Sequence, residues 1–383
     1  MFMKRVIMTL VLMIIVLLQY SFKFLNDQHT TVDISIDSLR IVYSRSTDHW
    51  PKPLLDSGVN FKELGMLPSP PFNENTDSVK HIVKLGKLLF FDPRLSSSNQ
   101  ISCSSCHAPD LNWTDGREVP KGHDHEVGTR NVPTIQNLWA SKRFFWDGRA
   151  ANLEEQASFP IGTKIEMHQD LGKLPRKIGK IKGYEDLFTA AFGDKKVNNN
   201  RITKALAMYQ KTLVSRKSDF DYFLAGNSKK LTDEQVLGLH LFRTKAKCIN
   251  CHNGPMFTNE EFHNLGLTYY GRDKYEDFGL YNLTSKPEDM GKFKTPSLRD
   301  VMRTGPWFHN GLFGNINGVM NMYNAGMPQP KPNKNQLNDP LFPKTDKLLT
   351  PLGLTPVEKE AIIAFLHAIT ADPWKIRQPE LPK

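Results

Sequence analysis

The side chains with the clearest capacity for chemistry are four cysteines, which occur in two copies of the pattern Cys-x-x-Cys-His. One copy lies in SCSSCHA and the other in KCINCHN, 145 positions further on, the difference between 103 and 248. The two thiols of this pattern can add across the vinyl groups of a haem, which places the next histidine beneath the iron. The sequence therefore predicts two covalent haem c groups, attached through Cys103, Cys106, Cys248 and Cys251, with His107 and His252 as proximal iron ligands.

Paired cysteines have two other common uses, disulfide bonds and zinc sites, and both stay open as alternatives. A disulfide within Cys-x-x-Cys closes a very short loop and removes little chain entropy, so it would stabilise the protein only slightly. Neither use explains why a histidine follows each pair. An exported, oxidising setting, which the N-terminus predicts, also disfavours four zinc thiolates. We expect haem attachment on these grounds.

Similar elements precede and follow the two motifs. LGKLLF begins at residue 85 and LGLHLF at residue 237, and we expect both on short amphipathic helices that end just before the cysteines. Each half closes with an apolar helix, the first over residues 202–213 and the second after the capping box of Thr355 and Glu358. Strand patterns are sparse. The predicted fold is mainly α, with two cytochrome c-like domains that each carry one covalently attached haem c and long ordered loops.

The chain divides into four predicted segments. Residues 1–28 form a signal anchor or signal peptide, because Lys4 and Arg5 precede an uncharged run of 17 residues from 6 to 22. We favour an uncleaved anchor in the inner membrane, with a cleaved signal as the alternative, and either predicts export to the periplasm. Residues 29–75 are a tether and a wrap over the first domain, 76–226 the N-terminal peroxidatic haem c domain, and 227–383 the C-terminal electron-transfer haem c domain.

The net charge of +10 over 383 residues would suit an acidic protein, an anionic membrane or nucleic acid. No basic repeat or basic-aromatic motif supports nucleic acid, so no nucleic-acid partner is expected. An acidic electron donor is compatible with the charge but is only weakly indicated by it.

Several further stretches resemble the bacterial di-haem cytochrome c peroxidases, including a related branch that matures a tryptophan-derived quinone in another protein. The resemblance implies a di-haem enzyme that reduces hydrogen peroxide to water with electrons from a donor such as cytochrome c or a cupredoxin, and it suggests a homodimer. The stretches run in order between about residues 80 and 370: FFDPRLS (90–96), GTRNVPT (128–134), FWDGRA (145–150), LEEQA (153–157), EM (166–167), KTPSLR (294–299) and FHNG (308–311).

The resemblance makes the N-terminal haem the peroxidatic one and implies roles around it. His123 is placed as a displaceable distal ligand, with His125 as the neighbouring candidate. Glu166 is placed as the distal acid–base residue and Gln156 as a polar group of the same pocket. This suits peroxide chemistry, since cleavage of the O–O bond moves a proton from the near oxygen to the leaving one. Trp146 is placed between the haems, where an indole can mediate electron transfer.

The second haem is where the sequence departs from the usual peroxidase, which closes this iron with a methionine. The residue in register after FHNG is Tyr323, and Met322 and Met320 lie close to it. A tyrosinate favours ferric iron and lowers the reduction potential. The quinone-maturing branch resembles the sequence here. We expect Tyr323 as the ligand, with Met322 or Met320 as the alternative, and this puts in doubt activation by an ordinary high-potential cytochrome c.

The resemblance also implies a calcium ion at the domain interface. Its ligands would be the side chain of Asn131 and the carbonyl groups of Thr304 and Pro306, which are oxygen ligands of the kind that Ca²⁺ takes.

Two functions compete with peroxide reduction. One is a high-valent di-haem oxidase that modifies side chains of a partner protein. The other is a di-haem electron carrier without catalysis, in which both irons are permanently six-coordinate.

Overall fold

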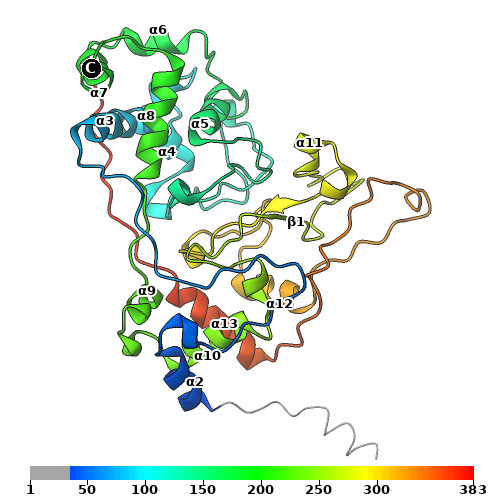
Figure 1. Ribbon diagram of the computed structural model, residues 1–383. Coiled ribbons are helices and arrows are strands. Elements are labelled where there is room, and N and C mark those ends of the chain that lie inside the picture. The colour runs from blue at the N-terminus through cyan, green and yellow to red at the C-terminus, as the bar shows by residue number, and fades with distance from the viewer. Residues whose placement is uncertain (1–34) are drawn as a thin grey trace, which may run out of the picture.

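The computed structural model describes residues 35–383, which fold into two helical lobes with a separate hydrophobic core in each (Figure 1). The mainly helical class is confirmed. The upper lobe of Figure 1 contains α3 (Asp77–Phe91), α4 (Cys103–Cys106), α5 (Leu153–Gly162), α6 (Leu174–Gly179), α7 (Lys182–Phe192) and α8 (Asn199–Lys211). The lower lobe contains α2 (Ile36–Tyr43), α9 (Asp219–Leu224), α10 (Asp233–Arg243), α12 (Ile316–Asn324) and α13 (Pro356–Ala368).

A smaller region beside the lower lobe carries α11 (Tyr281–Thr284) and the two-residue strands β1 (Phe262–His263) and β2 (Phe293–Lys294), which pair antiparallel (Figure 1). Short 3-10 helices interrupt the long loops, at Thr47–His49, Pro93–Leu95, Pro109–Leu111, His123–His125, Leu138–Ala140, Ser228–Lys230, Cys248–Asn250, Pro287–Asp289 and Val301–Arg303. The loops are therefore built from ordered turns.

Each core centres on one helix pair, α3 with α8 and α10 with α13. Gly86 of α3 faces the backbone of Ala205, and Gly238 of α10 faces the backbone of Ala361 in the same way. A methyl group at either glycine would overlap the facing carbonyl oxygen. The repeated Leu-Gly sequence thus provides the close helix contact at the base of each core, since only glycine lacks the atom that would clash.

The predicted helix starts of the second half are confirmed. The Thr232 hydroxyl accepts a hydrogen bond from the amide of Gln235, and the Thr355 hydroxyl accepts one from the amide of Glu358. The expected end of the first helix differs from the structure. Helix α3 ends at Phe91, well before Cys103, because Pro93 and the 3-10 turn that follows divert the chain.

The N-terminal segment packs on the second core, so the expectation that it covers the first domain is wrong for its helical part. Tyr43 and Trp50 are buried in the second core. The fully buried Arg243 of α10 lies against both rings, pairs with Glu63 and donates to the carbonyl oxygen of Pro51 at 2.6 Å. Desolvating a guanidinium requires these partners, which fixes the segment in place.

No helix within residues 35–383 is long and apolar enough to cross a membrane. The predicted signal segment 1–28 lies outside the described residues.

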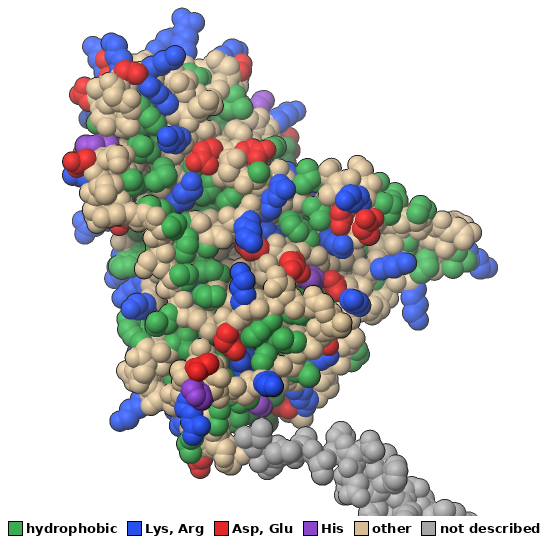
Figure 2. All heavy atoms as spheres, viewed as in Figure 1, with side chains coloured by type: hydrophobic (Ala, Val, Ile, Leu, Met, Phe, Trp, Pro, Cys, Tyr) green, Lys and Arg blue, Asp and Glu red, His purple; other side chains and the backbone are tan. Residues whose placement is uncertain are grey.

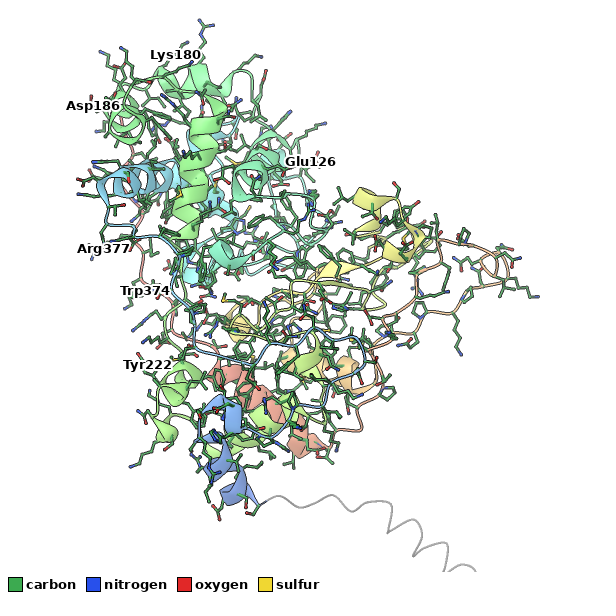
Figure 3. All side chains as sticks on the ribbon, in the orientation of Figure 1. Glu126, Lys180, Asp186, Tyr222, Trp374 and Arg377 are labelled. Carbon is green, nitrogen blue, oxygen red and sulfur yellow. The ribbon has the colours of Figure 1, made fainter. Side chains whose placement is uncertain are left out.

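The last residues of the chain return to the first lobe, where Figure 1 shows the C-terminus beside α7. The amide of Gly183 donates to the carbonyl of Lys383 at 2.8 Å, and Arg94 donates to the carbonyl of Pro382 at 2.8 Å. On the way, the indole of Trp374, visible in Figure 3, donates to the carbonyl of Val214. At both ends of the described chain, therefore, a terminal segment packs on the lobe that is farther from it in sequence.

Candidate functional site

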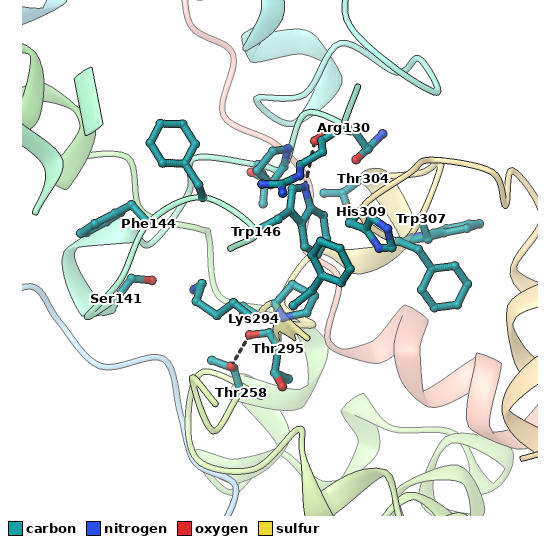
Figure 4. A pocket seen from close by; sticks show the side chains of 18 of the residues that line it. Arg130, Ser141, Phe144, Trp146, Thr258, Lys294, Thr295, Thr304, Trp307 and His309 are labelled. Carbon is teal, nitrogen blue, oxygen red and sulfur yellow. Dashed lines mark hydrogen bonds between the residues drawn. The ribbon is translucent and has the colours of Figure 1, made fainter. Parts of the chain in front are cut away.

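A single cavity of about 1100 Å³ is lined by both Cys-x-x-Cys-His motifs. Ligand cavities in proteins usually measure roughly 300–1,000 Å³, so this one has room for large cofactors. Its walls come from loops of both lobes, including the segments around Trp146 and His309 (Figure 4). The structure therefore brings the two motifs, which are far apart in sequence, to one common space.

The two motif histidines are held in the orientation that a metal ligand needs. Nδ1 of His107 lies 2.9 Å from the carbonyl oxygen of Trp113, and Nδ1 of His252 lies 3.1 Å from that of Phe257. A proton on Nδ1 that is donated to the carbonyl leaves the Nε2 lone pair available to a metal. Burial lowers the pKa of His107, and it lowers the pKa of His252 to about 4, so both rings are neutral at physiological pH.

The four motif cysteines form no disulfide bonds with one another. Burial raises the pKa of Cys103 and of Cys248 to about 12, so both carry their protons. Among residues 35–383 no three or more His, Cys, Asp or Glu side chains gather as a metal-binding cluster. The cavity, the paired thiols and the two oriented histidines fit two haem c groups.

Helix α5 and the turn after it carry the acid–base residue and the polar residue predicted for the first haem. Both Glu166 and Gln156 line the cavity. The amide of Glu166 donates to the carbonyl of Thr163, which ties it to the end of α5. Burial raises the pKa of the Glu166 carboxyl, and the Arg149 guanidinium opposes part of that effect. A buried carboxyl near the thiols of the first motif can exchange protons with a ligand bound there.

The two predicted distal histidines lie elsewhere. His123 is not among the residues that line the cavity; its ring packs against that of His168, with centroids 4.7 Å apart. Only the backbone of His123 reaches the site, where its amide donates to the carbonyl of Glu166 at 2.7 Å. His125 is exposed. The structure therefore does not bring either histidine together with the Glu166 side chain in the cavity.

The centre of the cavity is built by two stretches with the same backbone conformation, 163 positions apart, the difference between 146 and 309. Phe145 and Phe308 have φ values of 67° and 66°, and Gly148 and Gly311 have φ values of 69° and 63°. Antiparallel bridges join Phe144 to Ala150 in the first stretch and Trp307 to Phe313 in the second. The internal repeat thus extends well beyond the cysteine motifs.

Each stretch accepts one backbone hydrogen bond from the opposite half of the chain, and the two bonds are equivalent. The amide of Asn131 donates to the carbonyl of His309 at 2.7 Å, and the amide of Lys294 donates to the carbonyl of Trp146 at 2.8 Å. Asn131 and Lys294 are also 163 positions apart, so the pair is related by an approximate twofold axis. The indole of Trp146 donates to the carbonyl of Asn131 at 2.9 Å (Figure 4). Trp146 is therefore held at the joint between the halves by hydrogen bonds of its side chain and of its backbone.

Helix α12 supplies the candidates for the second haem. Tyr323 and Met320 line the cavity, whereas Met322 packs into a small hydrophobic cluster and is not part of the lining. Burial raises the pKa of Tyr323, and the thiols of Cys248 and Cys251 act in the same direction, so these sulfur atoms lie nearby. Of the three candidate ligands, Tyr323 and Met320 have access to the second motif.

The residues of the predicted calcium site, Asn131, Thr304 and Pro306, all line the same cavity. The side-chain nitrogen of Asn131 donates to the carbonyl of Arg117 at 2.9 Å, so it is the side-chain oxygen that would be left to bind a cation. This arrangement is compatible with an oxygen ligand to Ca²⁺.

Sequence reasoning missed an ion-pair network at the joint between the halves. Nη1 of Arg130 lies 2.6 Å from a carboxylate oxygen of Asp147, and Nε of Arg130 lies 2.6 Å from one of Asp277. It also missed the cavity-lining His309. The repeat between residues 145–148 and 308–311 could have identified His309, because the histidine occupies the position of the predicted Trp146.

Comparisons with known proteins agree with this site. The family profile described as di-haem cytochrome c peroxidase matches residues 80–229. The chain is 35% identical over 327 residues to the methylamine utilization protein MauG of Methylophilus methylotrophus, covering 84% of this chain and 91% of that protein. It is 32% identical over 348 residues to the cytochrome-c peroxidase IdrP1 of Pseudomonas sp. (strain SCT), covering 83% and 89%. A solved MauG-like protein associated with microbial copper homeostasis has a TM-score of 0.68 at 26% identity, over 82% of this chain and 95% of that chain.

Proposed function

The chain belongs to the di-haem cytochrome c peroxidase family, and on this basis we propose that it is a di-haem c enzyme that reduces hydrogen peroxide to water with electrons from a donor protein. The observation that carries this proposal is the half-buried carboxyl of Glu166, with its raised pKa, in the cavity shared with the first motif. A protein that only carries electrons has no need of an acid–base group there.

The proposed chemistry needs two electrons and two protons for each peroxide, which becomes two molecules of water. A haem held by Cys103, Cys106 and His107 would supply a redox-active iron site for the peroxide. The Glu166 carboxylate accepts the proton of the nearer oxygen and delivers it to the farther one, which then leaves as water. The Gln156 amide, on the same cavity wall, orients the peroxide by hydrogen bonding.

Electrons enter near the second motif and reach the first through the joint that holds Trp146. The indole is fixed through its own nitrogen, and the backbone carbonyl of the residue is fixed by Lys294. This rigidity suits a relay, because an electron-transfer route needs a constant geometry. Asn131, Thr304 and Pro306 bind a calcium ion at the same joint and stiffen it further.

Two features make this protein differ from a peroxidase that needs reductive activation. His123 packs outside the cavity, so peroxide reaches the first haem without the departure of a histidine ligand. Tyr323 is the ligand that closes the second haem, since it lines the cavity beside the second pair of thiols. A phenolate ligand lowers the potential of that haem.

The protein acts in the periplasm, with the segment 1–28 as its export signal or inner-membrane anchor, and it works as a homodimer. Its donor is a small cytochrome c or cupredoxin. Lys and Arg side chains are spread over both lobes of the face in Figure 2, in keeping with an acidic donor surface.

The proposal is tested by stopped-flow measurement of peroxide consumption with reduced cytochrome c. Consumption of two donor electrons per peroxide is the expected result. A protein whose absorption spectrum does not respond to peroxide, and which consumes none, would be an electron carrier and would contradict the proposal.

A second function, oxidation of side chains in a partner protein, is favoured by one observation. Tyr323 in the cavity sets this chain apart from a methionine-closed peroxidase, and the 35% identical relative is named MauG. The two functions differ in where the electrons come from. With peroxide but no reduced donor, an oxidase modifies its partner protein, and mass spectrometry detects the modification, whereas a peroxidase stops after a single turnover.

A further inference from the structure

The internal repeat gives the predicted calcium site a counterpart elsewhere at the joint. The 3-10 helices Leu138–Ala140 and Val301–Arg303 are 163 positions apart, the difference between 138 and 301, and the residues just before them have φ values of 60° and 61°. The bridged stretches that follow keep the same offset, as do Asn131 and Lys294, whose amides make equivalent hydrogen bonds. The two halves therefore keep one register throughout this part of the joint.

This register identifies the counterparts of the three predicted calcium ligands. In the order Asn131, Thr304 and Pro306, they are Lys294, Ser141 and Arg143, which we call the counterpart site. A carbonyl group is present at every residue, so the two backbone ligands have counterparts of the same kind. The side-chain ligand has none, because a lysine offers an ammonium group and no oxygen. The counterpart site thus contains a positive charge that belongs to the chain itself.

The Lys294 ammonium group is held between the halves by a carboxylate. Nζ of Lys294 donates to Glu260 at 2.9 Å, and the two side chains are 14% and 15% exposed. The same carboxylate accepts a hydrogen bond from the hydroxyl of Ser141 at 3.1 Å and one from the amide of Lys142 at 2.9 Å. In Figure 4 the Lys294 side chain extends toward Ser141. Glu260 is therefore bound both to the lysine and to the stretch that corresponds to Thr304.

Contacts to the loops after the two motifs support the same equivalence independently of the numbering. The side-chain nitrogen of Asn131 donates to the carbonyl groups of Arg117 and Glu118, which follow the first motif, at 2.9 and 3.3 Å. The side chain of Lys294 donates to Glu260, which follows the second motif. In each half, the side chain at this position thus binds the loop that follows the motif of its own half.

We propose that the ammonium group of Lys294 takes the place of a second divalent cation, so that the joint is held by one exchangeable calcium ion and by one fixed positive charge. The inference rests on the calcium site that the proposed function includes, but not on peroxide reduction. A Ca²⁺ ion beside the ammonium group would be repelled, and the carboxylate of Glu260 is already paired. Because the amide of Lys294 also holds the carbonyl of Trp146 at 2.8 Å, this side of the joint keeps its geometry when calcium is removed.

The test is the number of calcium ions bound per chain of the holoprotein, measured by calorimetric titration after chelation and checked by elemental analysis. Lys294→Asn supplies the side-chain oxygen of the equivalent position and frees the Glu260 carboxylate, so it is expected to bind one ion more than the wild type. Lys292→Asn is the matched control, since Lys292 pairs with Asp289 at 3.1 Å, two positions away, and does not line the cavity. It is expected to bind as many ions as the wild type.

Equal numbers of ions in Lys294→Asn and the wild type would overturn the proposal, and so would an additional ion in Lys292→Asn. Lys294→Asp, which supplies a carboxylate oxygen, is measured alongside and gives the answer where the asparagine variant loses its haems. A purely structural role of Lys294 would change the melting temperature but not the calcium number. The number for the wild type, one or none, tests the calcium site of the proposed function separately, and none of these measurements involves peroxide.

Discussion

Replacement of Glu166 by glutamine is the most direct test of the proposed chemistry. Glutamine keeps the size of the side chain and removes its ability to accept and return a proton. General acid–base catalysis contributes about 10²–10⁴-fold to rate, which corresponds to roughly 2.7–5.5 kcal/mol in the barrier. Because Glu166 is half-buried and its carboxyl is partly desolvated, water is a poor substitute for the missing base. We therefore expect a loss of kcat/KM in the upper half of that range, about 10³–10⁴-fold.

The pH dependence follows from the raised pKa of Glu166. The carboxylate form starts the reaction, so the wild-type rate falls as pH decreases through this pKa. Because burial places the pKa above the usual value for glutamate, the acid limb lies at higher pH than it would for an exposed residue. Glu166→Gln has no group to titrate there, and its remaining activity is expected to lack this limb.

The assay is stopped-flow peroxide reduction with reduced cytochrome c, with haem content measured in parallel to show that both groups are attached. Glu154→Gln is the matched control, since Glu154 lies on α5, which precedes the turn that carries Glu166, pairs with Lys211 and does not line the cavity. Its rate is expected to equal that of the wild type. Undiminished peroxide consumption in Glu166→Gln, or an unchanged acid limb, would refute the role given to this carboxyl.

Four further predictions concern the rest of the site and the fold. Tyr323→Phe is expected to change the electron paramagnetic resonance spectrum of one haem and to raise its potential, and an unchanged spectrum would exclude Tyr323 as a ligand. Gly238→Ala overlaps the backbone of the facing helix and should destabilise the protein by about 1–3 kcal/mol in denaturant unfolding, whereas Gly314→Ala, with nothing within 4 Å of the added methyl, should not. His123→Ala should leave the peroxide reaction of the resting enzyme unchanged, and a change in its resting spectrum would show that His123 binds the iron. Calcium chelation should lower the melting temperature of the wild type but not that of Asn131→Ala, and equal effects on both would place the ion elsewhere.

The sequence was sufficient for features that depend on local pattern. Helical periodicity and capping predicted α10 and α13, and the cysteine pattern identified the two motifs that both line the cavity. The path of the loops was not predictable in this way, since a loop follows the contacts that satisfy its polar and aromatic groups. The N-terminal segment packs where the rings of Tyr43 and Trp50 contact the buried guanidinium of Arg243. The C-terminal segment ends where Arg94 of the other lobe donates a hydrogen bond to it. Neither contact leaves a periodic signal in the sequence.

The approximate twofold axis explains how one repeated backbone can support two unequal haem sites. Equivalent positions of a repeat meet near such an axis, and here Arg130 lies over the ring of its equivalent, Phe293, at 5.6 Å. Two arginines at this place would repel each other, whereas two phenylalanines would remove the arginine that pairs with Asp277 and would leave Asp147 with Arg149 alone. A difference between the halves is thus required at the joint itself. The difference between the halves extends to the equivalent residues Trp146 and His309. In the proposed function, an electron that crosses the joint therefore passes between two different environments. Such a difference suits a protein that takes electrons at one haem and delivers them at the other.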